Sequence, residues 1–212
     1  MEVLKIFGIT QITTAKTDWM YNPNTYVILV ESEDGQKSYG GSRIHIAGNE
    51  FPLPIEEAIG KMDNNIYRMV KDSVPFGAGE FCGLWNSREV AGMGIGTVFL
   101  GRASVAVASM LNVNKLFGLC APTTYPNSIK IGYETIISLG MEGKFYYPKE
   151  DLLATSLIIH DVANLPTAFD EDREYINSLR NKPIQYRKEK YKLGDIEIQY
   201  DLTVNKKIQL LQ

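Results

Sequence analysis

The feature that most constrains this chain is a glycine at every second position directly before a long apolar segment. Residues 92–96 read Gly-Met-Gly-Ile-Gly, and residues 97–111 are apolar on most sides. A helix of that composition must be buried against a sheet. Compact apolar runs at 80–85 and 116–121 flank the loop and the helix and indicate two buried strands. Strand, glycine loop, buried helix and strand form a βαβ unit, whose two strands pair in parallel.

A hairpin and a helix are predicted before this unit. Two apolar runs at 26–30 and 38–46 flank the dipeptide Asp34-Gly35, which is typical of a tight hairpin turn. Farther on, apolar residues recur in steps of three and four, which predicts one amphipathic helix over 55–71. The apolar stripe of that helix consists of Ile55, Ile59, Met62, Ile66 and Met69.

The C-terminal part predicts a further strand, a helix and a hairpin. The strand covers 152–159, and acidic residues at the start and basic residues at the end favour a helix over 170–180. Residues 196–204 alternate between apolar and polar side chains, which is typical of a strand with one buried face. Gly-Asp at 194–195 predicts the turn that joins this strand to residues 187–193.

Composition limits the classes of partner. The chain has 212 residues, 22 Lys plus Arg and 25 Asp plus Glu, so its net charge of −3 argues against nucleic acid and anionic membranes as partners. Its two cysteines are too few for a disulfide framework or a zinc site, and no run approaches the ~20 apolar residues of a membrane span. We therefore expect a cytoplasmic, single mixed α+β domain over residues 1–212 without a metal, with a C-terminal helix and hairpin extension from about residue 150.

The glycine loop itself predicts a local anion site. Backbone amides at the start of a helix point toward solvent, glycines let a phosphate approach them, and the helix dipole favours negative charge. A dinucleotide fingerprint needs Gly-x-Gly-x-x-Gly and an acid about 20 residues later, and a P-loop needs Gly-Lys-Ser or Gly-Lys-Thr. Neither pattern occurs at residues 92–96, so a nucleotide-dependent oxidoreductase is disfavoured.

The strand and loop resemble those of the GNAT acyltransferase superfamily, which read Glu-x-x-x-Leu-x-Val and then Arg-Gly-x-Gly-x-Gly. In the same register this chain has Glu80-x-x-x-Leu84-x-Asn86 and then Ala91-Gly92-x-Gly94-x-Gly96. Gly132-Tyr133 stands where the family has a Gly-Phe pair, so the resemblance spans roughly residues 26–145. It implies a GNAT-like acyl-CoA N-acyltransferase fold, in which a central mixed sheet is flanked by helices.

The resemblance also implies a donor, acetyl-CoA or a longer acyl-CoA. In the family the loop amides bind the pyrophosphate of coenzyme A, and the preceding strand pairs with the pantetheine arm. Ala91 stands where most members have Arg or Gln, so Arg88 is a candidate contact in its place. The implied donor-binding residues are Leu84, Trp85, Asn86, Arg88, Gly92, Met93, Gly94, Ile95, Gly96 and Thr97.

More narrowly, the chain resembles the branch of the acyl-homoserine-lactone synthases and N-acyl amino acid synthases. Their Gly-x-Arg-Leu strand matches Gly-Ser-Arg-Ile at 41–44, which implies a substrate-binding role for Arg43. Their Glu-Leu-Ser-Arg strand matches Glu-Phe-Cys-Gly at 80–83, after the helix at 55–71. The family arginine is absent at Gly83, and Asn22 stands where lactone synthases usually have an acid. Both departures argue against a lactone synthase as such.

Acyl transfer from a thioester to an amine needs a base for the amine proton and donors for the developing oxyanion. Glu80, at the start of the strand that leads to the loop, is the candidate base. The general acid of the family, a tyrosine, falls near Ser128, with Tyr125 and Tyr133 as neighbours. The candidate catalytic residues are therefore Glu80, Tyr125, Ser128 and Tyr133.

Other polar residues favour structural roles. Arg102 lies on the polar stripe of the buried helix and is expected to be solvated. His45 and His160 have no partner pattern, so packing or surface positions are favoured. Cys120, between apolar neighbours, is expected to be a small core residue.

The leading hypothesis is an N-acyltransferase that moves an acyl group from acyl-CoA, or from acyl carrier protein, to a small-molecule amine, as a monomer or homodimer. The alternative is a non-catalytic GNAT-like protein that binds coenzyme A or an acyl chain, favoured by Ala91 and by the absence of the usual tyrosine. Only 25 residues precede Tyr26, so the acceptor pocket is expected to be open or to be built by the C-terminal part.

Overall fold

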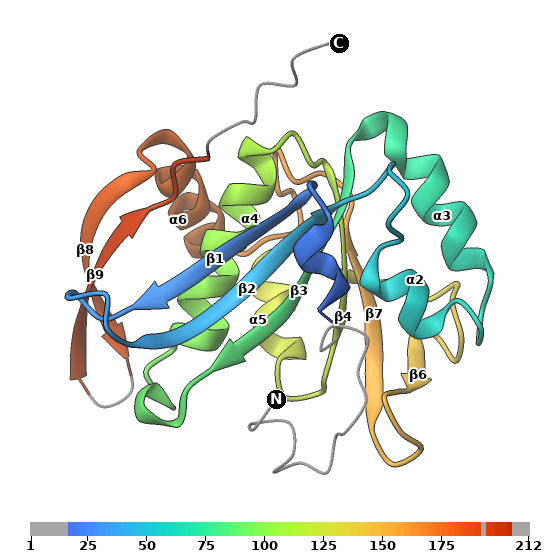
Figure 1. Ribbon diagram of the computed structural model, residues 1–212, viewed down its shortest axis with the longest axis horizontal. Coiled ribbons are helices and arrows are strands. Elements are labelled where there is room, and N and C mark those ends of the chain that lie inside the picture. The colour runs from blue at the N-terminus through green and yellow to red at the C-terminus, as the bar shows by residue number, and fades with distance from the viewer. Residues whose placement is uncertain (1–16, 192–193, 205–212) are drawn as a thin grey trace.

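The computed structural model describes residues 17–191 and 194–204, which form a twisted central sheet with helices on both faces and a separate two-stranded sheet (Figure 1). The helical elements, with short turns marked η, are η2 (Asp18–Tyr21), α2 (Pro54–Ile59), α3 (Asn65–Ser73), η3 (Val74–Phe76), η4 (Arg88–Val90), η5 (Ile95–Phe99), α4 (Leu100–Met110), α5 (Tyr125–Lys130) and α6 (Asp170–Asn181). The strands are β1 (Thr25–Glu31), β2 (Ser38–Ile46), β3 (Ala78–Asn86), β4 (Lys115–Cys120), β5 (Glu134–Thr135), β6 (Lys144–Tyr146), β7 (Leu153–Ile159), β8 (Ile184–Tyr191) and β9 (Gly194–Asp201).

The central sheet is mixed, as expected. Its strands run in the order β1-β2-β3-β4-β7-β5, and β6 also pairs with β7. Every pair is antiparallel except β3 with β4, which are joined through the glycine loop and α4. The predicted hairpin and the predicted βαβ unit are therefore confirmed, and so is the mixed α+β class.

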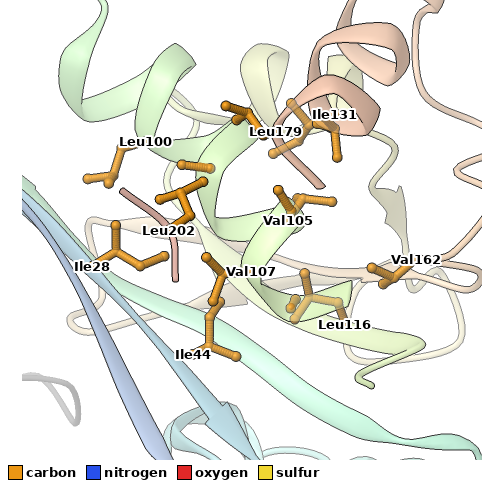
Figure 2. Close-up of a cluster of buried hydrophobic side chains, with 14 of the residues drawn as sticks. Ile28, Ile44, Leu100, Val105, Val107, Leu116, Ile131, Val162, Leu179 and Leu202 are labelled. Carbon is orange, nitrogen blue, oxygen red and sulfur yellow. The ribbon is translucent and has the colours of Figure 1, made fainter. Parts of the chain in front are cut away.

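Each face of the sheet has its own hydrophobic cluster. The larger one joins the sheet to α4 and α6, and Figure 2 shows Ile28 and Ile44 of the sheet facing side chains of these helices. The smaller cluster lies under α2 and α3. Neighbouring residues of β4 alternate between them, since Leu116 belongs to the larger cluster and Phe117 to the smaller. The sheet is thus covered on both faces around β4.

The single helix predicted over 55–71 is wrong, because the chain forms α2 and α3 with a break between them. Gly60 caps α2, and a side chain there would collide with the Tyr67 ring. Asp63 then accepts a 3.0 Å hydrogen bond from the N–H of Asn65, which starts the second helix. Met62 of the predicted apolar stripe lies exposed in the break. The three-and-four spacing continues across a turn of the chain, so periodicity alone does not reveal the break.

The C-terminal helix and hairpin pack on the larger cluster. Leu179 of α6 and Leu202, just after β9, both point into it (Figure 2). The alternation predicted for the last strand is confirmed, with Tyr200 and Leu202 buried. The turn predicted at 194–195 is wrong, because Gly194 already pairs with Tyr191. Residues 192–193, which join the strands, lie outside the described residues.

Candidate functional site

The parallel strands β3 and β4 separate at Glu80. They pair only where Ala78–Glu80 meets Lys115–Phe117. Beyond that point β3 continues to Asn86 beside β2, while β4 continues to Cys120 beside β7. The facing edges of the two strands are therefore not used for pairing with each other. An extended ligand can pair with such an edge as an additional strand would.

A β-bulge in β3 lies just beyond the point of separation. Between the pairs Arg43–Cys82 and Gly41–Trp85, β3 has one residue more than β2. Gly83 in this stretch has a φ of +61°, in the left-handed region that favours glycine. A bulge bends a strand and redirects its backbone groups. The bend therefore coincides with the place where β3 leaves β4.

The glycine loop joins β3 to the helix. Gly92 and Gly94 have φ values of +83° and +78°, which side chains rarely adopt. The Gly94 carbonyl accepts hydrogen bonds from the N–H groups of residues 97–99 and starts the π-helical turn η5, which continues into α4. A Cβ added to Gly96 would lie 2.4 Å from the Cβ of Asn86. The glycines thus bring the N-terminus of the helix against the end of β3.

The side chains of the other predicted donor-binding residues point in several directions. Three of them, Leu84, Met93 and Ile95, pack against the larger core cluster, so their backbone is the part that can reach a ligand. The Trp85 indole lies over Gly41, on the face of the sheet that bears α2. Arg88 is exposed and Thr97 is half-buried. The loop therefore offers a phosphate mainly backbone amides.

Glu80 is a buried carboxyl at the point of strand separation. It is 2% exposed, and its Oε2 accepts a 2.7 Å hydrogen bond from the N–H of Ile55 in the first turn of α2. Burial raises the pKa of Glu80 to about 8, against the opposing effects of the Ile55 hydrogen bond and the Arg43 charge. A carboxyl with a pKa near neutral can take up and release a proton during a reaction.

Three strands present nine residues on the face of the sheet that bears α2, and we call this set the nine-residue face. Side chains in register on neighbouring strands lie on the same face. The rows across β1, β2 and β3 are Thr25–His45–Glu80, Val27–Arg43–Cys82 and Leu29–Gly41–Trp85. The first row is polar and largely buried, whereas the third is apolar and its side chains are exposed.

Arg43 occupies the centre of the nine-residue face. Its guanidinium is buried and lies 4.2 Å from the centre of the Trp19 ring. Burial lowers the pKa of Arg43, while its interactions with Cys82 and Glu80 act in the opposite direction. A Cβ added to Gly83 would lie 2.6 Å from the Nε of Arg43. Arg43 thus fills the space beside Gly83, and a side chain at that position would displace the guanidinium.

Three polar residues near Arg43, namely Asn22, His45 and Thr25, differ in how their polar atoms are satisfied. The Oδ1 of Asn22 accepts hydrogen bonds of 2.9 Å from the N–H of Asn24 and from Nδ2 of Asn49, which joins the turn before β1 to the loop after β2. The Nε2 of His45 and the Oγ1 of Thr25 are buried without a hydrogen-bond partner in the described part of the chain. Burial, helped by Arg43, lowers the pKa of His45 to about 4, so the imidazole is neutral at pH 7.

Of the candidate acids, Tyr133 lies at the point of strand separation. Its hydroxyl donates a 3.3 Å hydrogen bond to the carbonyl of Phe117, which pairs with Glu80 in the last parallel position. Its ring packs beside Gly118 in β4. Burial raises the pKa of Tyr133 well above 10, and the nearby Glu80 acts in the same direction. Tyr133 therefore stays protonated and can act as a proton donor.

The other two candidate acids belong to α5. The Tyr125 hydroxyl lies 3.1 Å from Oγ1 of Thr135, and Oγ of Ser128 donates a 3.2 Å hydrogen bond to the carbonyl of Thr124. These contacts tie α5 to β5 and to its own first turn. Cys120, at the end of β4, is half-buried, and burial raises its pKa to about 11. A neutral thiol fits the structural role expected for it.

The expectation that Arg102 is solvated is wrong. Its side chain is 8% exposed and forms a 2.7 Å ion pair with Asp172 of α6, and its guanidinium lies 4.4 Å from the centre of the Tyr175 ring. The polar stripe of α4 is thus covered by α6. Beside it, between α4, α5 and α6, lies a cavity of about 310 Å³, whose polar lining includes Asn127 and Lys130.

Two findings concern all the described residues, beyond the candidate site. In residues 17–191 and 194–204, no three His, Cys, Asp or Glu side chains are grouped so that they could hold a metal ion. No helix in the same residues is long and apolar enough to cross a membrane.

This arrangement of sheet, bulge and glycine loop is the fold of the GNAT acyltransferases, and the resemblance stated above is confirmed at the level of fold. No family model matches the chain, and no curated protein matches its sequence. FeeM, an N-acyl amino acid synthase from uncultured soil microbes, superposes with a TM-score of 0.55 at 15% identity, over 75% of this chain and 85% of that protein.

Two further solved structures superpose less closely. MesI, a CoA-dependent acyl-homoserine lactone synthase, gives a TM-score of 0.42 at 16% identity, over 73% of this chain and 69% of its own. A mutant form of the spermidine N-acetyltransferase SpeG from Vibrio cholerae gives 0.43 at 13% identity, over 78% and 76%. At such identities the likeness concerns the fold, and any activity must be argued from the site.

Sequence reasoning missed the first row of the nine-residue face. It treated His45 and Thr25 as packing or unremarked positions, whereas they lie in register with Glu80. A signal was present, because Arg43 and His45 are two residues apart on a predicted strand and must share a face. Burying two polar side chains on one face costs free energy unless they find partners, so the pair marks this face as a candidate site.

Proposed function

We propose that the protein is an N-acyltransferase that transfers an acyl group from acyl-CoA to an amine. The observation that carries this proposal is the meeting of three features at the separation of β3 and β4. Glu80 lies on one face of the sheet, the Tyr133 hydroxyl approaches Phe117 at the same position along the strands, and the glycine loop follows at the end of β3.

The donor would pair with the bulged edge of β3. Its pantetheine arm would take the backbone positions from Leu84 to Asn86, and its pyrophosphate would meet the amides that follow Gly92. The cavity beside η5 and Lys130 would take the nucleotide part. An acyl carrier protein is the donor we propose instead if no acyl-CoA binds.

The chemistry would then divide between the two faces of the sheet. Ionised Glu80 takes a proton from the amine as its nitrogen attacks the thioester carbon, and backbone N–H groups near the bulge stabilise the oxyanion. The carbon–sulfur bond breaks, and the leaving thiolate takes a proton from Tyr133. The products are an amide and coenzyme A.

Donor binding can be measured as thermal stabilisation. A ligand at 100 times its dissociation constant stabilises a fold by about 2.7 kcal/mol, which for this size is roughly 5 to 11 °C in melting temperature. We expect acetyl-CoA or a longer acyl-CoA to give such a shift, NAD to give none, and Gly94→Val to abolish it. Valine at a φ of +78° is strained, and its side chain would meet the Phe99 ring.

The control for this strain is Gly35→Ala, in the turn between β1 and β2. Gly35 has a φ of +68° and open space around it, so the change adds backbone strain in a different turn, outside the loop. It should lower the melting temperature without altering the shift on adding donor. A full shift in Gly94→Val would show that the loop does not bind the phosphates. Stabilisation without thiol release, for every amine, would favour the binding protein over the enzyme.

Tyr133→Phe is expected to lower the rate of thiol release by about tenfold. The effect is modest because a thiol has a pKa near 8.5, so the thiolate is a fair leaving group without an acid. The variant also loses the hydrogen bond to Phe117, at about 0.5–1.5 kcal/mol of stability. The same change at Tyr125, the rival candidate, should leave the rate within about twofold. A larger loss in Tyr125→Phe than in Tyr133→Phe would exchange the two assignments.

A further inference from the structure

A row of polar side chains runs from the edge of the sheet to Glu80. The register places Thr25 of β1 opposite His45 of β2, and His45 opposite Glu80 of β3. Side chains directly opposite each other on antiparallel strands have Cβ atoms about 4.5–5.5 Å apart. His45 and Glu80 are 4% and 2% exposed, whereas Thr25, on the outermost strand of the described sheet, is only partly buried. His45 therefore lies between the buried carboxyl and the edge of the sheet.

Two atoms of this row lack the hydrogen bonds that buried polar atoms normally make. The Nε2 of His45 and the Oγ1 of Thr25 are buried, and neither has a hydrogen-bond partner in the part of the chain that the structure describes. Nearly all buried polar atoms in native proteins have a partner, because an unsatisfied one costs free energy. Packing alone would be served better by an apolar side chain. An unsatisfied imidazole beside a candidate base therefore indicates a role in the chemistry.

The proposed reaction releases a proton whenever the acceptor arrives as an ammonium ion. An alkylamine has a pKa of about 10, like the lysine side chain, so it is charged at pH 7. Its nitrogen loses two protons on becoming an amide. One of them balances the proton that Tyr133 gives to the thiolate, and the other must leave the site through Glu80. A neutral amine loses only one proton, so its acylation releases none.

Few other groups near Glu80 can take this proton. The ionisable groups that interact with Glu80 are Arg43 and Cys82 of the sheet, Tyr133, and Glu56 and Glu57 of α2. Arg43 is a cation, and burial raises the pKa of both the Cys82 thiol and the Tyr133 hydroxyl, which keeps them protonated. Glu56 is the rival outlet, because it is partly exposed and burial raises its pKa.

We propose that His45 carries the proton of Glu80 toward solvent, as a positioning residue in the proposed acyl transfer on which this role rests. The proton passes from the Glu80 carboxyl to Nε2 of His45, and from there past the Thr25 hydroxyl to water at the edge of the sheet. This restores the Glu80 carboxylate and the neutral imidazole. Burial and the Arg43 charge lower the pKa of His45 to about 4, so the imidazole holds the proton only briefly.

The test compares two acceptors in the full-length protein at pH 7. The amine 2-phenylethylamine is an ammonium ion at this pH, whereas methoxyamine is neutral, and thiol release from acetyl-CoA gives kcat for each. His45→Gln keeps a polar side chain that cannot carry a proton. We expect it to lower kcat for 2-phenylethylamine about tenfold and to leave kcat for methoxyamine within about twofold. A merely structural role of His45 would lower both rates alike.

Glu56→Gln is the matched control. The Oε2 of Glu56 accepts a 2.7 Å hydrogen bond from the N–H of Leu53, and the oxygen of glutamine can accept the same bond. Both acceptors need ionised Glu80, so this variant should leave the ratio of the two rates unchanged. Thr25→Val keeps the shape and removes the hydroxyl. It covers the case in which His45→Gln does not fold, and should lower kcat for 2-phenylethylamine about threefold.

The imidazole nitrogens of His45 give a readout that needs no turnover. The chain has two histidines, and His45→Gln removes the signals of one of them. Nitrogen-15 NMR of the parent protein at pH 7 should show Nε2 of His45 without a hydrogen, because only a nitrogen with a free electron pair can take the proton. A hydrogen bound to Nε2 overturns the inference.

The kinetic outcomes separate this inference from the acyl transfer itself. Unchanged rates in both His45→Gln and Thr25→Val, or equal losses with the two amines, overturn the role of His45 even though acyl transfer is observed. A selective loss with 2-phenylethylamine in Glu56→Gln alone overturns it as well and makes Glu56 the outlet. If the parent protein acylates neither amine, the proposed transfer fails, and the role of His45 fails with it.

Discussion

Glu80→Gln is expected to lower the rate of thiol release by about 10²–10⁴-fold, because general base catalysis typically contributes that much. Glutamine keeps the shape of the side chain, and its oxygen can still accept the hydrogen bond from Ile55. The loss should therefore appear in kcat, with donor-induced stabilisation unchanged. A variant that retains the full rate at every pH would remove Glu80 from the mechanism.

The pH profile of the parent protein follows from the same residue. Only the ionised carboxylate can take a proton, and the pKa of Glu80 is about 8. With an acceptor amine whose own pKa lies well below 8, so that the nucleophile is already neutral, kcat is expected to rise about tenfold per pH unit below the pKa of Glu80 and to level off above it. The residual rate of Glu80→Gln should not show this rise with pH, because glutamine does not ionise.

Glu80→Gln should lower the rate of thiol release but raise the stability of the folded protein at high pH. The pKa of Glu80 is higher in the folded protein than its ordinary value of 4.5, so folding favours the protonated form. The stabilising contribution is complete below the pKa of the unfolded chain and is lost as the pH rises through about 8. Glutamine stays neutral. At pH 9 we therefore expect Glu80→Gln to be more stable than the parent, by on the order of a few kcal/mol.

Urea unfolding at pH 5 and pH 9 measures this difference. The parent should lose more stability than the variant between the two values. Equal losses in both proteins would mean that Glu80 is not held in a medium that disfavours its charge. An inactive variant that becomes more stable at high pH would mark Glu80 as a residue kept for chemistry, since a structural residue lowers stability when it is replaced.

Asp172→Ala is expected to destabilise the fold by about 3–5 kcal/mol, or roughly 6 to 20 °C in melting temperature. Asp172 and Arg102 are 6% and 8% exposed, so removing the carboxylate leaves a buried guanidinium without its main partner. Burial works against the charged form, but the hydrogen bond and the charge of Asp172 raise the pKa of Arg102 overall. The arginine cannot escape the penalty by losing its proton.

Two control variants test whether the buried ion pair between Arg102 and Asp172 causes this loss of stability. Glu171→Ala removes the second acidic neighbour of Arg102, whose side chain is 86% exposed, and should lower stability by less than about 1 kcal/mol. The double variant Arg102→Met with Asp172→Leu replaces the pair by apolar side chains and should recover most of the stability. If Asp172→Ala alone proves as mild as Glu171→Ala, the ion pair does not hold α6 on α4.

Much of the fold could be predicted because its signals are local. The hairpin at Asp34-Gly35, the glycine loop and the alternation at 196–204 each follow from residues close together in the chain. The break between α2 and α3 was not predicted because it depends on the close approach of Gly60 and Tyr67. It also depends on the hydrogen bond from the N–H of Asn65 to Asp63, which starts α3. The burial of Arg102 was not predicted because its ion-pair partner, Asp172, lies 70 residues away in the chain.

Some residues of the candidate site likewise follow from short sequence patterns, whereas others depend on the assembled fold. The position of Glu80 at the start of a strand and the glycines before the helix were visible in the sequence, because each is part of a short pattern. The choice of Tyr133 over Tyr125 and Ser128 needed the contact with Phe117, which is set by the packing of a loop against β4. Register across three strands, which places Thr25 and His45 in the same row as Glu80, is likewise a property of the assembled sheet.

The short pairing between β3 and β4 has a consequence for the mechanics of the fold. The three residue pairs between β3 and β4 join two antiparallel parts of the sheet, β1–β3 and β4–β7. Apart from these pairs, helices such as α4 and α2 and side-chain packing hold the two parts together. Sub-global opening of a protein follows its least protected junction. A ligand that pairs with the edge of β3 would lengthen this junction, so occupancy and the cohesion of the two parts rise and fall together.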